Sequence, residues 1–251
     1  MPQHASPHQP PTHRSIAACA SAAHIATLAA WLALASTSAH AARPLNTDDA
    51  NIVDAKSCQL ESWTRRTSHG TELWAIPGCN PWGGTEFSVG AGRQTDQVAG
   101  GAGFRVLQVK ARLLPVTPQS AGLALTLGTT RFSGDATSPA QRDTYINLPF
   151  TAPLGHDRYL HLNAGWVRHH SSATSRLTWG VGTELPLSER IIAVAETYGE
   201  QGTQAKAQVG LRFWVVPQRV QIDTTLGNSL SAPRDRWLSI GLRLLSPAFL
   251  P

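Results

Sequence analysis

The sequence predicts an all-β fold, an antiparallel transmembrane β-barrel of about twelve strands with both termini periplasmic. Three observations predict it. From about residue 58 onward the chain alternates apolar with polar or small residues, which is typical of strands with two unlike faces. The alternating segments are about 8 to 13 residues long, close to the roughly 9 to 11 residues that cross a bilayer at a tilt. Only 15% of the 251 residues are charged, against roughly 25% in soluble domains.

The composition excludes several other classes of protein. Mean hydropathy is −0.16, whereas several helical spans of about 20 apolar residues would raise it well above zero. Eight Trp, six Phe and three Tyr at low charge are not typical of a disordered chain. The formal net charge is +5, but the basic residues are scattered singly, so we expect no nucleic acid partner.

The first 41 residues predict a cleaved secretory signal peptide. Residues 16–36 are rich in Ala and Leu and carry no Asp, Glu, Lys or Arg, and Ala39 and Ala41 fit the small-x-small pattern of a signal-peptidase site. An uncleaved membrane anchor is the alternative, because the apolar stretch is long enough to span a bilayer. After it we expect a periplasmic N-terminal segment at 42–57 and an outer-membrane β-barrel at 58–251.

The period-two pattern is clearest in residues 203–216, where Val209 and Leu211 alternate with Gln208 and Arg212. Glycines inside the strands share the polar face, as a narrow barrel needs small residues within. We expect strands near residues 58–67, 71–77, 84–92, 102–114, 120–132, 143–150, 157–168, 173–185, 190–199, 203–215, 219–228 and 235–245.

The connections between these strands are of two kinds. Short Pro-bearing connections alternate with polar or Gly/Ser-rich ones, as required if each kind lies at its own end of a barrel. With twelve strands both termini fall at the periplasmic end, so Cys58 and Cys79 lie at the base of the first hairpin. An isolated cysteine pair in an oxidising compartment is most simply a disulfide, and we expect Cys58 to bond to Cys79.

The inward positions form the predicted lumen, on which basic and acidic residues are nearly balanced. One interpretation is a basic, selective pore for anionic or polar solutes, because rings of Arg and Lys select anions. The other is a salt-bridge network that fills the barrel and holds it rigid. We expect the segment that contains Asp48 and Asp49 to be a periplasmic tail, with entry into the lumen as the alternative. The candidate lumen-lining residues are Arg65, Lys110, Arg112, His161, Arg176, Glu184, Lys206, Arg212, Arg219, Asp223 and Arg243.

A local motif opens the mature chain. Arg43-Pro44-Leu45-Asn46-Thr47-Asp48-Asp49-Ala50, followed by Cys58-Gln59-Leu60-Glu61-Ser62-Trp63 and the hairpin array, resembles uncharacterised proteobacterial outer-membrane barrels. In particular it is similar to porin-like proteins of the phenol meta-pathway outer-membrane type. The chain departs from the usual barrel at its end, where Phe249 is followed by Leu250 and Pro251 rather than closing the chain. The resemblance implies no catalytic or binding residues.

These features favour a porin-like channel for passive passage of small polar or aromatic solutes. The alternative is a plugged structural or adhesive barrel without a conducting pore. A barrel enzyme acting on lipids is less favoured, because no G-x-S-x-G or comparable motif is present; we expect His161 to be a lumen hydrogen-bonding residue and His169-His170 a solvated loop pair. We expect no catalytic residues, metal site or cofactor. The expected partners are outer-membrane lipids and the barrel assembly machinery, and we assign no oligomeric state.

Overall fold

The computed structural model describes residues 45–96, 100–133 and 141–251, and the predicted signal peptide at 1–41 lies outside them. All twelve predicted strands are present. Most extend one to four residues beyond the predicted bounds because backbone pairing continues past the alternating pattern. The strands are β1 (Ser57–Thr67), β2 (Gly70–Asn80), β3 (Thr85–Asp96), β4 (Gly100–Leu114), β5 (Gly122–Ser133), β6 (Gln141–Pro153), β7 (Tyr159–His169), β8 (Thr174–Pro186), β9 (Ile191–Glu200), β10 (Lys206–Val216), β11 (Val220–Ser229) and β12 (Arg236–Leu245).

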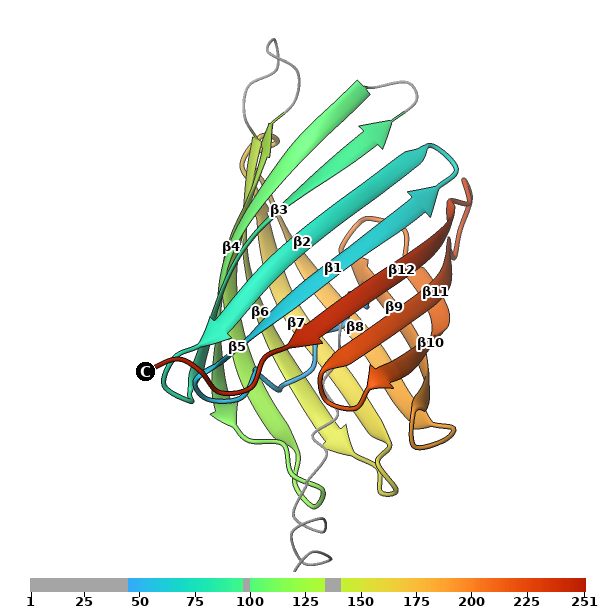
Figure 1. Ribbon diagram of the computed structural model, residues 1–251. Helices are drawn as coiled ribbons and strands as arrows, with labels where there is room; N and C mark the ends of the chain where they lie inside the picture. The colour runs from blue at the N-terminus through green and yellow to red at the C-terminus, as the bar shows by residue number, and fades with distance from the viewer. Residues whose placement is uncertain (1–44, 97–99, 134–140) are drawn as a thin grey trace, which may run out of the picture. The chain divides into compact units, whose positions relative to one another are not determined.

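The strands form one closed antiparallel barrel. Each strand pairs with its neighbour in sequence, and β1 pairs with β12 from Gln59↔Leu245 to Thr67↔Trp237, so the sheet has no edge (Figure 1). Closure matters because an open edge would leave backbone amides and carbonyls unpaired, which a bilayer does not tolerate. The predicted fold class is confirmed.

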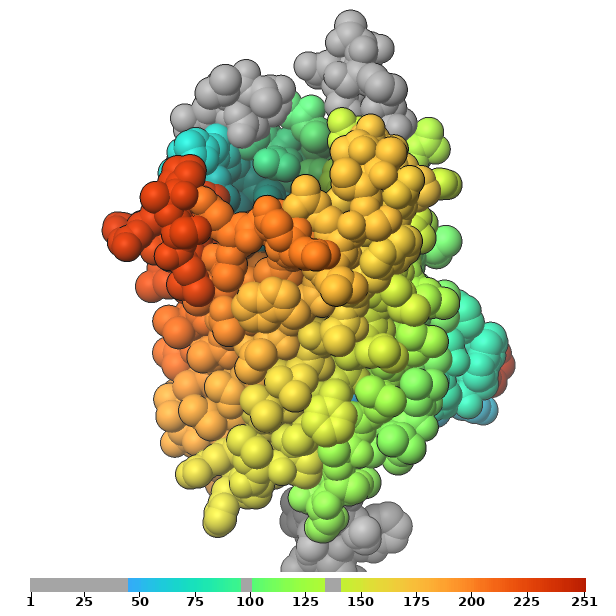
Figure 2. Space-filling model, turned by 180° about the vertical axis from the view of Figure 1, so that it is seen from behind, coloured from blue at the N-terminus to red at the C-terminus, as the bar shows by residue number. Residues whose placement is uncertain are grey.

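The two faces of the wall differ as the alternation predicts. In β12, Leu238 and Ile240 are exposed on the outside, whereas Trp237, Ser239 and Arg243 are buried inside. The other strands repeat this pattern, so large apolar side chains cover the outer wall. Figure 2 shows the face of this wall that is formed by β5 to β10. A soluble monomer rarely exposes so large an apolar surface, whereas a lipid-facing wall requires one.

The barrel has two distinct ends. The turn end carries the connections 81–84, 115–121, 154–158, 187–190 and 217–219, and among the described residues the loop end carries 68–69, 170–173, 201–205 and 230–235. β3 continues to Asp96 and β4 begins at Gly100, beyond the predicted bounds of 92 and 102, because Gln94 pairs with Ala102 and Thr95 with Gly101. The run of small residues there suggested a loop, but glycines can still form the backbone hydrogen bonds that pair two strands.

Both ends of the described chain meet at the turn end. Ser246 donates its backbone N–H to the Cys58 carbonyl at 2.9 Å, and Phe249 and Leu250 donate theirs to the Lys56 carbonyl. The C-terminal residues therefore pack along the start of β1, and Phe249 is exposed.

The segment before β1 differs from the expectation. Residues 42–57 were expected to form a tail outside the barrel, yet Leu45, Ala50 and Val53 are 5%, 0% and 2% exposed, and the described part of the segment, from residue 45, runs inside the barrel (blue in Figure 1). The physical reason is that the inner wall offers carboxylates and hydroxyls that accept hydrogen bonds from its backbone. We call residues 45–53 the plug.

The cysteine pair is placed as predicted. Cys58 and Cys79 are directly opposite in the β1–β2 ladder, with their Cα atoms 4.0 Å apart, and they form a disulfide. Their neighbours Gln59 and Gly78 face inward, so the bridge lies on the outer side of the wall.

We therefore predict that thiol labelling of the denatured protein rises by two thiols on reduction, because Cys58 and Cys79 are bonded to each other. Counting the attached label by mass spectrometry before and after reduction checks this. A Cys58→Ser, Cys79→Ser variant should show no increase. Full labelling of both cysteines before reduction would contradict the bond.

Candidate functional site

Ten of the eleven predicted lumen residues are at inward positions of strands, but Arg112 and Arg219 do not line the lumen. Arg219 precedes β11 and lies exposed in the turn between β10 and β11, because β11 begins only at Val220. Arg112 is exposed next to a register shift in β4, and its Nη2 donates to the Gly83 carbonyl at 2.6 Å. Both arginines lie at the turn end, where the strands stop.

The plug is held chiefly by hydrogen bonds from its backbone to side chains of the wall. Glu196 of β9 accepts the Asn46 and Thr47 N–H groups at 2.9 and 2.6 Å. On the opposite side, Glu86 of β3 accepts the Val53 N–H at 2.9 Å. Two buried carboxylates therefore fix the two ends of the plug.

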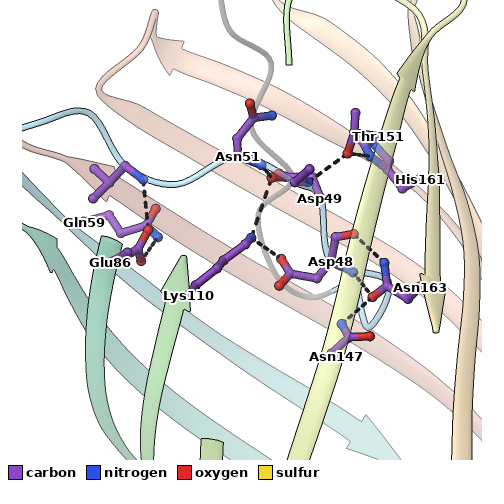
Figure 3. A network of polar contacts seen from close by, with 12 residues as sticks. Asp48, Asp49, Asn51, Gln59, Glu86, Lys110, Asn147, Thr151, His161 and Asn163 are labelled. Carbon is purple, nitrogen blue, oxygen red and sulfur yellow. Dashed lines mark hydrogen bonds and ion pairs between the residues drawn. The ribbon is translucent and has the colours of Figure 1, made fainter. Parts of the chain in front are cut away.

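Between those ends, uncharged side chains of β6 and β7 accept the hydrogen bonds of the plug's backbone. Asn163 Oδ1 accepts the Asp48 N–H at 2.8 Å, and Thr151 Oγ1 accepts the Ala50 N–H at 2.8 Å. Asn163 also donates to the Asp48 carbonyl (Figure 3). Because the acceptors come from β3, β6, β7 and β9, the plug crosses the inside of the barrel rather than following one strand.

A buried lysine anchors the centre of the plug. Lys110 of β4 points at the segment, with Nζ 2.9 Å from Asp48 Oδ1 and 3.8 Å from Asp49 Oδ1 (Figure 3). Lys110 and Asp49 are almost fully buried. Removing one partner of such an ion pair leaves an uncompensated charge, so Lys110 and the two aspartates depend on one another.

Two glycines of β8 make room for the plug. A Cβ atom at Gly180 would lie 2.7 Å from Thr47 Oγ1, and one at Gly182 would lie 3.3 Å from Thr47 Cβ. A side chain at either position would push the plug away from the wall. The inward glycines were expected only to narrow the barrel, and on β8 they accommodate the plug.

A second network lies toward the turn end. Arg212 of β10 bridges Glu184 of β8 at 2.6 Å and Asp223 of β11 at 2.7 Å, and all three side chains are 1% exposed. Gln221 donates to Asp223, and His161 lies 3.5 Å from Glu184. This network matches the predicted salt-bridge interpretation for this part of the lumen.

His161 is also the centre of an arrangement that superficially suggests catalysis. Its Nδ1 lies 2.9 Å from Thr151 Oγ1, with Glu184 beyond the ring. Thr151 is fully buried, however, and already accepts the Ala50 N–H of the plug. Neither residue lines the large cavity described next, so a solute there does not reach them.

Above the plug, toward the loop end, the lumen holds a cavity of about 720 Å³. Asn46 and Asp48 of the plug contribute to its lining, together with wall residues that include Trp63, Trp74, Tyr145, Asn163, Tyr198 and Lys206. Beside the plug, against β1 to β4, the free space falls to about 40 Å³. The cavity is therefore a cup at the loop end whose floor is the plug.

Aromatic rings form one side of this cup. Trp63 and Trp74 stack with centroids 5.6 Å apart, and Trp74 stacks on Phe104 at 4.7 Å. Gly92 of β3 is paired with Trp74 on β2 and with Phe104 on β4. A Cβ atom at Gly92 would lie 2.7 Å from the Trp74 ring. The period-two pattern of a single strand does not predict this stack, which depends on packing across three strands.

Charged side chains line the opposite rim. His169 lies 3.0 Å from Asp143 and 3.1 Å from Glu200, and Arg176 reaches Glu200 at 3.2 Å. The expectation of a solvated His169-His170 loop pair is therefore wrong for His169, which ends β7 and faces inward. The alternation along β7 could have predicted the inward orientation of His169, because His161 and Asn163 also have odd numbers and lie on the same face of the strand.

Among the described residues, no three His, Cys, Asp or Glu side chains are grouped as a metal site requires. No helix in the described ranges is long and apolar enough to cross a membrane.

Comparisons with known proteins agree with the architecture. The solved structure of the KdgM porin aligns with a TM-score of 0.55 at 12% identity, covering 74% of this chain and 98% of that one. The NanC porin aligns with a TM-score of 0.54 at 9% identity, again over 74% and 98%. At such low identity these matches show that the fold is that of outer-membrane porin-like barrels.

No curated protein gives a significant match to the sequence. One family model matches residues 29–245, which is most of the chain. The chain therefore belongs to the family described as "Uncharacterised conserved protein UCP029691".

Proposed function

We propose that this protein is a porin-like channel of the outer membrane for passive passage of small polar or aromatic solutes, restricted by the plug. The cup-shaped cavity carries the proposal. Its volume of about 720 Å³ falls within the roughly 300 to 1,000 Å³ of small-molecule sites. In this assignment the signal peptide exports the chain, the barrel assembly machinery inserts it among outer-membrane lipids, and both termini are periplasmic.

The lining of the cup supports solutes of low net charge. Apart from His169, the charged side chains in the lining are Lys206 and the carboxylates of Asp48, Asp143 and Glu200, and of these Asp48 is paired with Lys110 and Glu200 with Arg176. One lysine beside three carboxylates is not the excess of Arg and Lys that selects anions. The exposed parts of Trp63 and Trp74 add apolar surface, which suits the aromatic solutes that the phenol meta-pathway resemblance implies.

The solved structures do not assign a solute. One is titled as the KdgM porin in complex with disordered oligogalacturonate, and that ligand belongs to that protein. The solute class is therefore argued from the cup alone.

The plug favours a second candidate, a structural barrel that does not conduct. Its buried backbone bonds and the Lys110 ion pair close the turn-end side of the cup. The two candidates differ in whether the plug leaves its site, which conductance measures directly.

We predict that the folded protein shows discrete conductance steps in planar bilayers. Electrophoresis with and without boiling first verifies the closed barrel by a shift of the unboiled band. If the verified protein shows no conductance steps at any voltage, the channel is ruled out and the plugged barrel remains.

We predict that Lys110→Met raises the open probability at least about tenfold, because loss of a charge-assisted bond of roughly 1.5 to 3 kcal/mol weakens docking of the plug. The matched control is Lys206→Met, which removes the same charge from the cup without a contact to Asp48 or Asp49. Equal open probabilities in the two variants would show that the ion pair does not hold the plug.

An engineered disulfide between the plug and the wall provides an independent test of whether the plug must leave its site for conduction. In a Thr47→Cys, Gly180→Cys variant the two Cβ atoms would lie about 3.3 Å apart, close to the roughly 3.5 to 4.5 Å of a disulfide. We predict that oxidation abolishes the conductance steps and that reduction restores them. Wild-type protein under the same reductant controls for loss of the Cys58–Cys79 bond, and unchanged steps in the oxidised variant would contradict gating by the plug.

A further inference from the structure

The outer wall carries charge at one end only. On the described strands, each charged side chain at an outward position is an arginine in the half of the wall nearest the loop end, and none is acidic. These residues are Arg66, Arg93, Arg105, Arg131, Arg142, Arg168 and Arg236. The rest of the outward surface is apolar or neutral.

Three of these arginines stand side by side. Arg105 of β4 is directly opposite Arg131 of β5, which is directly opposite Arg142 of β6. Side chains directly opposite on one face have Cβ atoms about 4.5 to 5.5 Å apart, so the three arginines are neighbours on the outer wall. We call Arg105, Arg131 and Arg142 the arginine row.

The row has no counter-charge within the described part of the protein. Arg105, Arg131 and Arg142 are exposed, and none makes an ion pair or side-chain hydrogen bond with a described residue. Like charges directly opposite destabilise a sheet. Three adjacent arginines are therefore an unfavourable arrangement unless an anion binds across them.

The level of the row fits the boundary of a bilayer. Toward the turn end, the outward positions after Arg105 are Leu107, Val109, Ala111 and Leu113. From the row to the turn end of the strand there are 9 residues on β4, 9 on β5 and 11 on β6, which at about 3.4 Å each and a tilt near 40° span roughly 23 to 29 Å. That height matches an apolar band of about 25 Å, so the row lies at headgroup depth.

Arginine suits one class of anion at that depth. Its planar guanidinium donates two parallel hydrogen bonds to a phosphate group, and it is less strongly hydrated than an ammonium group. Arg93 and Arg168 flank the row diagonally and widen the basic surface, with Arg168 also donating to Ser175.

We propose that the arginine row binds the phosphate groups of an anionic lipid in the leaflet at the loop end. The proposal rests on the placement of the barrel in the outer membrane, and it adds a specific lipid chemistry on the outer wall. The lipid bridges Arg105, Arg131 and Arg142 and supplies the negative charge that the wall lacks.

The test is a titration of bisphosphorylated lipid A into folded protein in neutral detergent, with bound lipid counted by native mass spectrometry. Arg105→Gln, Arg131→Gln, Arg142→Gln should weaken binding at least about tenfold. The matched control is Arg158→Gln, Arg190→Gln, Arg219→Gln, which removes three exposed arginines from the turn end and should bind as wild type. Equal affinities for the two triple variants would overturn the proposal.

Two further arms identify the recognised group. Dephosphorylated lipid A should bind at least about tenfold more weakly than lipid A, and equal binding would show that the acyl chains alone are recognised. Inorganic phosphate should not displace the lipid at equal concentration; displacement would indicate a site for a soluble anion and would overturn the assignment to lipid.

The folding state of each variant is verified by the shift of the unboiled band in electrophoresis. If the triple variant does not fold, single Arg131→Gln is used, since Arg131 is directly opposite both other members of the row. Conductance is measured separately: loss of lipid binding with normal conductance contradicts only the arginine row, and normal lipid binding without conductance contradicts only the channel.

Discussion

Closure of the barrel by the β1–β12 pairing is the constraint on which the rest of the structure depends. A wall in lipid must pair every backbone amide and carbonyl, and a closed antiparallel sheet does so without an edge. Closure also assigns every second residue to the lumen. Charged side chains such as Glu86, Glu196 and Arg212 are consequently buried inside, where each must find a partner.

The plug supplies part of those partners. Glu196 accepts two of its backbone N–H groups and Glu86 accepts a third, while Lys110 balances its aspartates. In a water-filled lumen these groups are hydrated when the plug leaves, so each hydrogen bond contributes a net of only about 0.5 to 1.5 kcal/mol. A segment held by many such bonds is well ordered when docked, yet it undocks at a cost far below that of unfolding the barrel.

The strands were predictable from the sequence because each strand carries its own period-two pattern, and Cys58 and Cys79 followed from the hairpin. Entry of Asp48 and Asp49 into the lumen was only the alternative prediction, because Thr47-Asp48-Asp49-Ala50 has no period and its partners lie on β4, β6, β7 and β9. The one local motif of the resemblance is thus the segment that fills the lumen. Two errors were of one or two residues: Arg219 falls in a turn because β11 begins after it, and His169 ends β7 rather than opening a loop.

Charge also fixes the register of the wall. Arg105 and Lys110 are five residues apart on β4, and an odd separation in a strand places them on opposite faces. A slip of one residue would turn Lys110 into the apolar band, at a cost of roughly 2 to 4 kcal/mol near the bilayer midplane, and would turn Arg105 into the lumen. It would also separate Lys110 from Asp48 and Asp49. The lysine that holds the plug and the outward arginine near the loop end therefore enforce the same alignment of β4, which links the docked plug to the charged rim of the outer wall.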